Sequence, residues 1–538
     1  MPVWNFVRHS VYQDSVTLMR LTQNMHAVAG VRRAAAMMGT PANRALLEQA
    51  GLLDAEGRTA GPTDLVNAVV ADDGAAAESA CAVAEAALVA RRSAPTKPGA
   101  VHPRGLAGGL RALPDATLAL ISVPGVYAGA EARRALDAGL HVMLFSDNVP
   151  VETEIELKRV AIARGLFLMG PDCGTAIVGG VPLGFANAVP RGRIGIVAAS
   201  GTGLQEVSCR LAGEGEGVSH AIGVGGRDLS DPVGGRMTLA ALAALGADAA
   251  TEVVVVIGKA PGGAVAPRLA EALAALAKPS VVCLPRVDNT PGATPFSNSP
   301  PTVQAGLAVP ATTIPTSGAA PIHHASTLED AALAAVALAR REAPRAVEFS
   351  RPADEIERLV TTHAAALAAG QRFVRGLYAG GTLALEAVTL LSARLADVAP
   401  GVRGDGTAHR VVDLGDDVFT LGRPHPMIDG AVRGEWIARE AGDPATAVLL
   451  VDVVLGYGAH PDPAAELAPA IEAARRTAAG DGRGLAVVAS VTGTEQDPQV
   501  RSRQVVALGR AGVLVMDSNA QAARLAALIA ERAAGIEP

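Results

Sequence analysis

The stretch RIGIVAASGTGLQEVSCRLAGEG, residues 193–215, decides the fold. An apolar run ends at Ala199, and the residues after it have the spacing of an amphipathic helix, which opens at Ser200, Gly201, Thr202 and Gly203. A strand that passes directly into a helix is the unit from which doubly wound parallel sheets are built. We therefore predict an α/β protein.

The same pattern recurs along the chain. Examples of short apolar runs are LALISV (118–123), VVVVIG (253–258), AVLLVDVV (447–454) and GLAVVAS (484–490), and Ala-rich helical stretches separate them. Continuous apolar runs, without strict alternation, are typical of strands covered on both faces. The pattern predicts several doubly wound parallel sheets.

The 538 residues, of which 49% are hydrophobic, are enough for about three such domains. We place them at residues 1–188, 189–345 and 346–538. Residues 287–322 are rich in Pro, Thr, Ser, Ala and Gly and lack a hydrophobic period, so we expect a long loop within the second domain.

Composition excludes several classes of function. A net charge of -7 and an aromatic content of 3% do not suit nucleic-acid binding. No apolar run reaches the ~18 residues of a membrane span, and Arg8 and Asp14 interrupt what would be the core of a signal peptide. The four cysteines are dispersed and show no metal-ligand spacing. We expect a soluble cytoplasmic protein that needs no metal and no cofactor.

Two strand ends have the chemistry of an anion site. Ser200–Gly203 would place unpaired backbone N–H groups, two hydroxyls and the positive end of a helix dipole together. Gly456, Tyr457 and Gly458 follow a strand that contains Asp452, and their glycines would also let a ligand approach the backbone. An ordinary capped corner explains the first pattern equally well, and glycine turns after strands are common.

Further polar residues cluster in glycine-bearing loops after strands, where ligands of α/β proteins bind. The candidates are Asp172, Cys173, Arg227, Asp228, Asp417, Arg423, His425, Thr492, Thr494 and Glu495. Three of these residues also have structural explanations. Asp172 is suited to capping a turn and Cys173 to a buried position. His425 lies between two prolines, which is equally typical of a rigid loop. The two arginines favour a carboxylate or phosphate ligand, which the guanidinium fork binds at two points.

These motifs resemble known proteins. From LALISV through GPDCGT to ASGTG, the chain is similar to the α subunit of succinyl-CoA synthetase, and GLYAGGTLALEA through VLLVDVVLGYG resembles the last domain of its β subunit. The whole order, including MMGTPAN (37–43) and GRPHPMID, is similar to the FdrA family. The resemblance implies a Rossmann-like domain of the CoA-binding type over 1–188, followed by two flavodoxin-like ligase domains.

In the synthetases two helix N-termini grip the phosphate of a phosphohistidine. Ser200–Gly203 match the first and Leu455–Gly458 are assigned to the second. The GHAGA-type loop that carries that histidine is missing, as is an ATP-grasp domain, and no CoA-binding glycine signature is evident in residues 1–30. This combination favours a phosphorylated small substrate.

The FdrA resemblance implies a subunit of oxamate carbamoyltransferase, which acts with two further proteins in purine and allantoin nitrogen catabolism. The reaction converts carbamoyl phosphate and oxamate, a small amide, to oxalurate and phosphate. Arg227 or Arg423 would clamp the oxamate carboxylate, and His425 or Asp417 would assist proton removal. The alternatives are an acyl-CoA synthetase subunit with a separate ATP-grasp partner and a non-catalytic scaffold.

Overall fold

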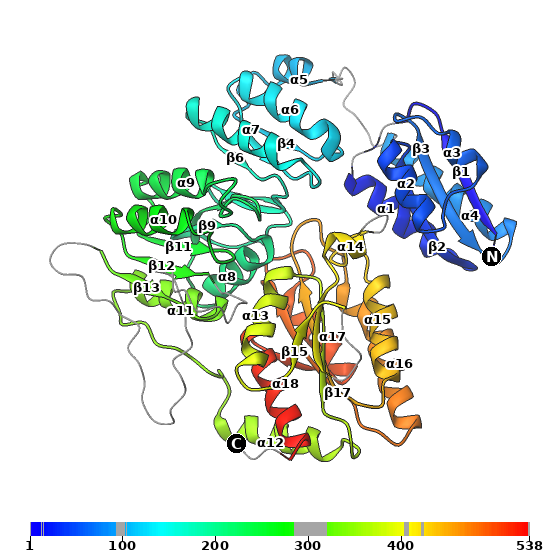
Figure 1. The fold of residues 1–538 in the computed structure, drawn as a ribbon, viewed down its shortest axis with the longest axis vertical. Helices are drawn as coiled ribbons and strands as arrows, with labels where there is room; N and C mark the ends of the chain where they lie inside the picture. Colours follow the sequence, from blue (N-terminus) through cyan, green and yellow to red (C-terminus); the bar gives the residue numbers. More distant parts are fainter. Residues whose placement is uncertain are drawn as a thin grey trace.

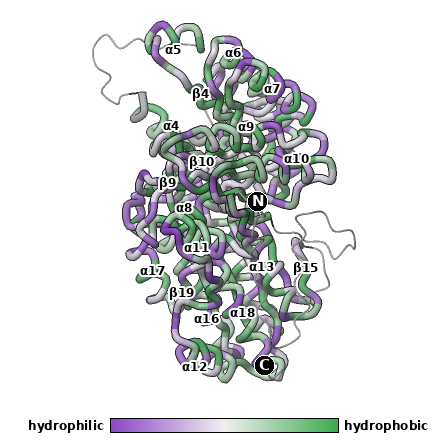
Figure 2. Tube along the Cα trace, turned by 90° about the vertical axis from the view of Figure 1, so that its left-hand side faces the viewer, coloured by the Kyte–Doolittle hydropathy of each residue, from purple (hydrophilic) through white to green (hydrophobic). Residues whose placement is uncertain are grey.

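The computed structural model describes residues 2–11, 13, 15–92, 103, 105–284, 320–402, 408–420 and 424–535. These residues form four β-sheets with helices packed on them (Figure 1). The unit around 105–170 and helix α12 (Ala353–Ala365) lie at opposite ends of the molecule in both ribbon and tube views (Figure 2).

The first unit is a small antiparallel domain. Its elements are β1 (Val3–Arg8), α1 (Ser15–His26), β2 (Val31–Met38), α2 (Pro41–Gln49), α3 (Ala55–Thr59), β3 (Leu65–Ala71) and α4 (Gly74–Arg92). The strand order is β1-β3-β2, and both neighbours run antiparallel to β3. Helices α1 and α4 cover one face of this sheet, and α2 covers the other.

This antiparallel sheet differs from the single Rossmann-like domain expected over residues 1–188. Every residue of β3 is buried, because β3 is the central strand and helices cover both of its faces. Its apolar run, LVNAVVA, is therefore nearly continuous, as in a parallel sheet. Burial on two faces produces the same sequence pattern in both kinds of sheet, so the pattern does not reveal strand direction.

A second unit carries the expected parallel sheet. It contains α5 (Leu106–Ala112), β4 (Leu118–Ile121), α6 (Gly125–Asp137), β5 (His141–Leu144), α7 (Val151–Ala163) and β6 (Leu168–Met169). The strand order is β4-β5-β6, and both pairs are parallel.

The third unit is a seven-stranded sheet of order β13-β12-β11-β9-β10-β7-β8. Its elements are β7 (Thr175–Val178), β8 (Val181–Gly184), β9 (Arg191–Ala198), α8 (Gly201–Gly213), β10 (Val218–Gly223), α9 (Arg236–Ala247), β11 (Val253–Ile257), α10 (Val265–Ala274), β12 (Ser280–Cys283), β13 (Ile322–His324) and α11 (Leu328–Ala339). The five strands from β13 to β10 are parallel, and the hairpin β7–β8 adds to the β10 edge in antiparallel pairing. This sheet therefore begins before residue 189, where the second domain was expected. Of the predicted long loop 287–322, residues 287–319 lie outside the described residues.

The fourth unit is a six-stranded, wholly parallel sheet of order β15-β16-β14-β17-β18-β19. Besides α12, its elements are β14 (Phe373–Tyr378), α13 (Gly381–Ser392), β15 (Val398–Pro400), β16 (His409–Asp413), α14 (Asp417–Thr420), α15 (Ala431–Gly442), β17 (Thr446–Val454), α16 (Pro463–Gly480), β18 (Ala486–Thr492), α17 (Arg501–Arg510), β19 (Leu514–Met516) and α18 (Asn519–Ala533). The mostly parallel α/β class predicted from the sequence is confirmed.

One hydrophobic core joins the third and fourth units. It contains residues of α8 and α11 from one unit and of α13 and α18 from the other, and α8 contacts α13 directly. Because burial of apolar surface is the main favourable term in association, this shared core holds the two sheets in a fixed arrangement. Any site between α8 and α13 is thus built on rigid elements.

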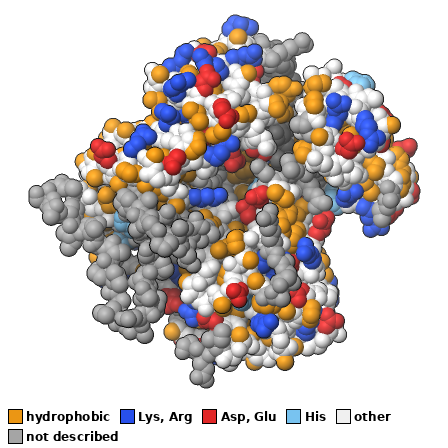
Figure 3. Space-filling view, viewed as in Figure 1, with side chains coloured by type: hydrophobic (Ala, Val, Ile, Leu, Met, Phe, Trp, Pro, Cys, Tyr) orange, Lys and Arg blue, Asp and Glu red, His pale blue; other side chains and the backbone are white. Residues whose placement is uncertain are grey.

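On the face shown in Figure 3, positive and negative side chains are interspersed. Within the described residues, no helix is both long enough and apolar enough to cross a membrane.

Candidate functional site

The first predicted corner has the local structure expected of it. Strand β9 ends at Ala198, Ser200 is the N-cap residue, and α8 begins at Gly201. The Gly203 N–H donates to Ser200 Oγ over 2.9 Å. The Thr175 hydroxyl of the GPDCGT loop also lies close to this corner. If Gly201 carried a side chain, its Cβ atom would lie 3.4 Å from Thr175 Oγ1. The corner thus combines a helix N-terminus with several hydroxyls.

A second helix begins opposite the first. Strand β14 ends at Tyr378, and α13 begins at Gly381 after Gly380. Ser200 Oγ and Thr382 Oγ1 lie 2.6 Å apart. A Cβ on Gly380 would stand 3.0 Å from the Thr202 side chain, so glycine permits the close approach. The positive ends of two helix dipoles, one from each ligase-type unit, therefore meet at one place.

The residues assigned to this second helix N-terminus lie elsewhere. Leu455–Gly458 follow β17, but the next helix, α16, begins only at Pro463. The Tyr457 N–H donates to the Ala186 carbonyl over 3.0 Å, and a Cβ on Gly456 would stand 2.7 Å from the Phe185 carbonyl oxygen. This turn packs against residues 185–187. The assignment to a helix N-terminus is corrected to Gly380–Thr382.

Two carboxylates stand at the start of α13. Asp452 accepts the N–H groups of Ala379 and Gly380 over 2.7 and 2.8 Å, and Arg433 lies 3.4 Å from it. Asp413 ends β16, and a Cβ on Gly381 would stand 2.5 Å from its Oδ2. Burial raises the pKa of Asp452, and burial raises the pKa of Asp413 to about 7. Neither carboxylate was predicted from the sequence as a site residue, although Asp413 ends an apolar strand and Asp452 interrupts one.

Of the three predicted catalytic residues, the structure describes only the side chain of His425. Its Nδ1 accepts the Met427 N–H over 3.2 Å, and a Cβ on Gly415 would stand 2.7 Å from its Nε2. Burial lowers the pKa of His425 to about 4, so the ring is neutral at physiological pH. Asp417 is the first residue of α14, but its side chain lies outside the described part of the structure, as does all of Arg423.

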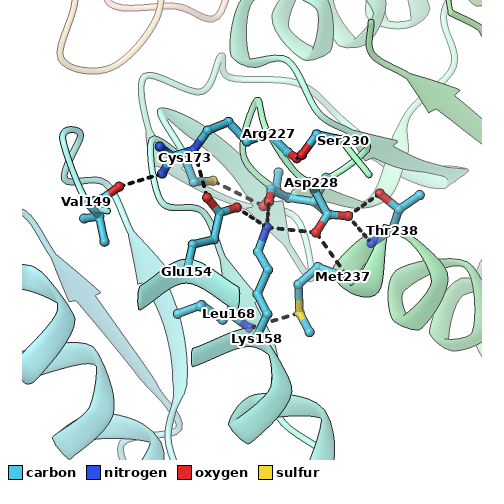
Figure 4. Close-up of polar contacts among 12 residues, drawn as sticks. Val149, Glu154, Lys158, Leu168, Cys173, Arg227, Asp228, Ser230, Met237 and Thr238 are labelled. Carbon is cyan, nitrogen blue, oxygen red and sulfur yellow. Dashed lines mark hydrogen bonds and ion pairs between the residues drawn. The ribbon is translucent and has the colours of Figure 1, made fainter. Parts of the chain in front are cut away.

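Three of the predicted substrate-binding residues, Cys173, Arg227 and Asp228, gather in a network between the second and third units (Figure 4). Buried Lys158 of α7 lies 2.7 Å from Glu154 and 2.8 Å from Asp228. Asp228 also accepts the N–H of Thr238 over 2.9 Å, at the start of α9. Asp228 is fully buried, so its contacts are those of a structural residue.

Arg227 and Cys173, the other two members of that network, differ in solvent exposure. Arg227 is half-exposed and donates to Glu154 Oε2 over 2.9 Å and to the Val149 carbonyl over 2.8 Å. Cys173 is buried, and desolvation raises the pKa of its thiol to about 12. The thiol is therefore protonated at neutral pH and is not a nucleophile. Asp172 is exposed and has a positive φ of 55° in the adjoining loop.

The VTGTEQDP segment lies mainly in the contact between the third and fourth units. Thr492 Oγ1 donates to Glu206 of α8, and Thr494 Oγ1 donates to the Ala188 carbonyl over 2.7 Å. Glu495 accepts the Ser502 N–H over 2.8 Å and lies at the surface. Thr492 and Thr494 therefore link the two units, and all three side chains already have partners within the chain.

Comparisons with known proteins now identify the family. A model described as the AllF heavy metal-associated domain matches residues 1–102, and a CoA-ligase model matches residues 377–529. The uncharacterized protein YahF of Escherichia coli (strain K12) is 37% identical over 538 residues, which cover 98% of each chain. The chain belongs to the FdrA family.

Two shorter matches connect this FdrA-family protein to CoA ligases. The SauD subunit of the ADP-forming sulfoacetate-CoA ligase of Bilophila wadsworthia (strain 3_1_6) is 32% identical over 169 residues, 30% of this chain and 56% of that one. The α subunit of the ADP-forming succinate–CoA ligase of Staphylococcus aureus (strain N315) is 33% identical over 155 residues, 28% of this chain and 49% of that one. The chain therefore carries a ligase domain like that of succinyl-CoA synthetase, and such relatives are subunits of larger enzymes.

The first unit does not fit a heavy metal, despite the name of its family model. Cys81 is the only cysteine in residues 1–102, and heavy metals prefer several thiolates. Burial raises the pKa of the Cys81 thiol to about 11. Among the residues that the structure describes, no three His, Cys, Asp or Glu side chains gather as a metal site. We derive no metal chemistry for this unit.

Proposed function

We propose that this protein is a carbamoyltransferase subunit that binds carbamoyl phosphate where α8 and α13 meet. The carbamoyl group passes to a small amide such as oxamate, and two further protein subunits complete the enzyme. The observation that carries the proposal is the contact between Ser200 and Thr382, which brings two helix N-termini together. Two such termini favour a doubly charged phosphate group.

The same geometry suits the chemistry of phosphate departure. Negative charge grows on the phosphate as its bond to the carbamoyl carbon breaks, and helix dipoles fixed in advance stabilise that charge without reorganising. Holding the amide beside the carbamoyl carbon supplies much of the remaining acceleration. Arg227 is already bonded to Glu154, so we assign the clamp on the oxamate carboxylate to Arg423.

A thermal-shift experiment on the purified full chain tests the proposal. Carbamoyl phosphate, inorganic phosphate, CoA and ATP are added separately, because a ligand that binds the folded state raises the melting temperature. We expect a shift with carbamoyl phosphate and with phosphate. Formation of oxalurate from carbamoyl phosphate and oxamate by the chain with its partner subunits is the decisive assay.

The match to the CoA-ligase model favours one alternative, an acyl-CoA ligase subunit that acts with an ATP-grasp partner. His323 and His324 are the nearest histidines after β12, and they lie in edge strand β13. A shift with CoA, together with ATP-dependent acyl-CoA formation, would establish the alternative and overturn carbamoyl transfer.

A further inference from the structure

Asp413 has a distinctive position in the candidate site. It is the last residue of β16, at the carboxyl end of the parallel sheet, and its Oδ2 lies against the first residue of α13. Its Oδ1 accepts the Gly415 N–H over 2.9 Å. The carboxyl group thus stands beside the helix N-terminus that Thr382 places against α8.

The charged groups around Asp413 come from three other elements. Asp452 of β17 and Asp416 of the following loop act on it with negative charge, while Lys259 acts with positive charge. Lys259 is exposed and follows β11 in the other ligase-type unit. Burial is the largest influence, and it holds the pKa of Asp413 at about 7. Asp413 therefore exchanges its proton in the range where an acid–base group is most effective.

The ring of His425 lies on the same side of Gly415 as the Asp413 carboxyl group. A Cβ on Gly415 would stand 2.7 Å from His425 Nε2 and 3.2 Å from Asp413 Oδ1. Since His425 Nδ1 accepts a backbone N–H, the proton of the neutral ring is on Nε2. The ring presents a hydrogen-bond donor to the space near Asp413, and its only basic nitrogen is already occupied. His425 is therefore not the base that the residue type suggested.

We propose that Asp413 is the catalytic base of the site. This inference rests on the proposed carbamoyl transfer. The acceptor amide nitrogen forms a bond to the carbamoyl carbon and loses one proton to the Asp413 carboxylate. The bond from that carbon to the phosphate oxygen breaks, and the phosphate leaves with the electron pair. Asp413 then gives its proton to the departing phosphate, which balances the reaction.

Ionisation of Asp413 has opposite effects on anion affinity and on the rate of carbamoyl transfer. When Asp413 loses its proton it places a negative charge beside the anion site, so anion affinity falls as pH rises through about 7. The ionised form is also the one that accepts a proton, so the rate of transfer rises over the same range. A structural carboxylate would not couple the two effects.

The binding test uses sulfate, whose charge is constant between pH 6 and pH 8, and the full-length chain. Calorimetry on the wild type should show sulfate binding about tenfold weaker at pH 8 than at pH 6. Asp413→Asn should remove most of this pH dependence, whereas the matched control Asp416→Asn, on the exposed neighbouring residue, should keep it. Equal pH dependence in the wild type and Asp413→Asn, at equal melting temperatures, would overturn the inference.

The kinetic test uses the chain with its partner subunits. Asp413→Asn should lower kcat about a hundredfold or more, with little change in KM for carbamoyl phosphate at pH 6. Unchanged kcat in this variant would overturn the role of Asp413 as base. If the wild type transfers no carbamoyl group, the proposed function fails. The sulfate experiment then still decides whether Asp413 is the titrating group of an anion site.

Discussion

Ser200 Oγ and Thr382 Oγ1 lie within hydrogen-bond distance, at 2.6 Å, although 182 residues separate them in the chain. Ser200 caps α8 and Thr382 lies in the first turn of α13. Their contact fixes two helix N-termini relative to each other across two sheets. The geometry of the proposed anion site therefore depends on how closely these two turns approach.

Gly380 sets that approach, which leads to the first prediction. A Cβ here would stand 3.0 Å from the Thr202 side chain, so Gly380→Ala should push the helix starts apart. We expect at least about tenfold weaker phosphate binding, measured by calorimetry, with a small loss of stability. Thr202→Ala, which removes the opposing Cγ2 and Oγ1 atoms and keeps Cβ, should restore part of the affinity in the double variant, with a coupling of about 0.5–3 kcal/mol. Additive effects of the two changes would contradict the close contact.

The second prediction concerns the thiols. Cys81, Cys173, Cys209 and Cys283 are all buried. Desolvation raises the pKa of each above the ordinary thiol range. In the native protein at pH 8, almost no thiol should therefore react with a disulfide reagent. All four thiols should react after denaturation. Rapid labelling of Cys173 in the native state would restore it as a candidate nucleophile.

The sequence predicted most of the fold because parallel strands covered on both faces carry a strong signal. The corner at Ser200–Gly203 was found for the same reason, since a buried strand, a capping residue and glycines follow in direct order. The antiparallel first unit was missed because the central strand β3, with helices on both faces, has the same apolar run as a parallel strand.

The candidate site was harder to predict because it depends on contacts between distant residues. Gly380–Thr382 lie within the quoted motif GLYAGGTLALEA, which has the same strand–glycine–helix order as the first corner. The glycines after Asp452 offered a similar pattern, and nothing local distinguishes the two. Only the packing of α13 against α8 shows which glycine turn faces Ser200. Asp413 likewise acquires its properties from burial, which no local pattern reveals.

The third prediction concerns Lys158, whose charge neutralises two buried carboxylates. Lys158→Met leaves Asp228 without its cation and leaves Glu154 with Arg227 alone, in a site where both carboxylates have almost no solvent exposure. We expect a loss of about 3–5 kcal/mol in the free energy of unfolding, measured with urea. Arg133 provides the matched control, because its pairs with Asp137 and Glu156 lie at the surface. Arg133→Met should cost less than about 1 kcal/mol, and equal losses in the two variants would contradict the role of burial.

The last prediction concerns Glu386, a buried carboxyl in the contact between α13 and α11. It accepts the Leu328 N–H over 2.6 Å and the Asn519 side-chain amide over 2.7 Å. Burial raises its pKa from the usual 4.5 to about 7 in the folded protein. The folded state thus holds a proton that the unfolded state loses between these two values. The contribution of Glu386 to stability is complete below pH 4.5 and is lost as pH rises to about 7.

Burial lowers the pKa of His409 and His425 to about 4, so these two side chains make the free energy of unfolding rise as pH rises toward 6.5. Glu386 acts in the opposite direction and should lower the free energy of unfolding by up to about 3 kcal/mol between pH 4.5 and pH 7. Asp413 contributes in the same direction, because its pKa is also raised to about 7. Glu386→Gln should remove the falling contribution, so that between pH 5 and pH 7 the stability of the variant should rise relative to that of the wild type, measured by urea unfolding at a series of pH values. Asp354→Asn, at a fully exposed carboxyl whose pKa the Arg358 side chain lowers, should leave the pH dependence unchanged. An equal pH dependence in the wild type and in Glu386→Gln would show that the Glu386 carboxyl is already ionised in the folded protein over this interval.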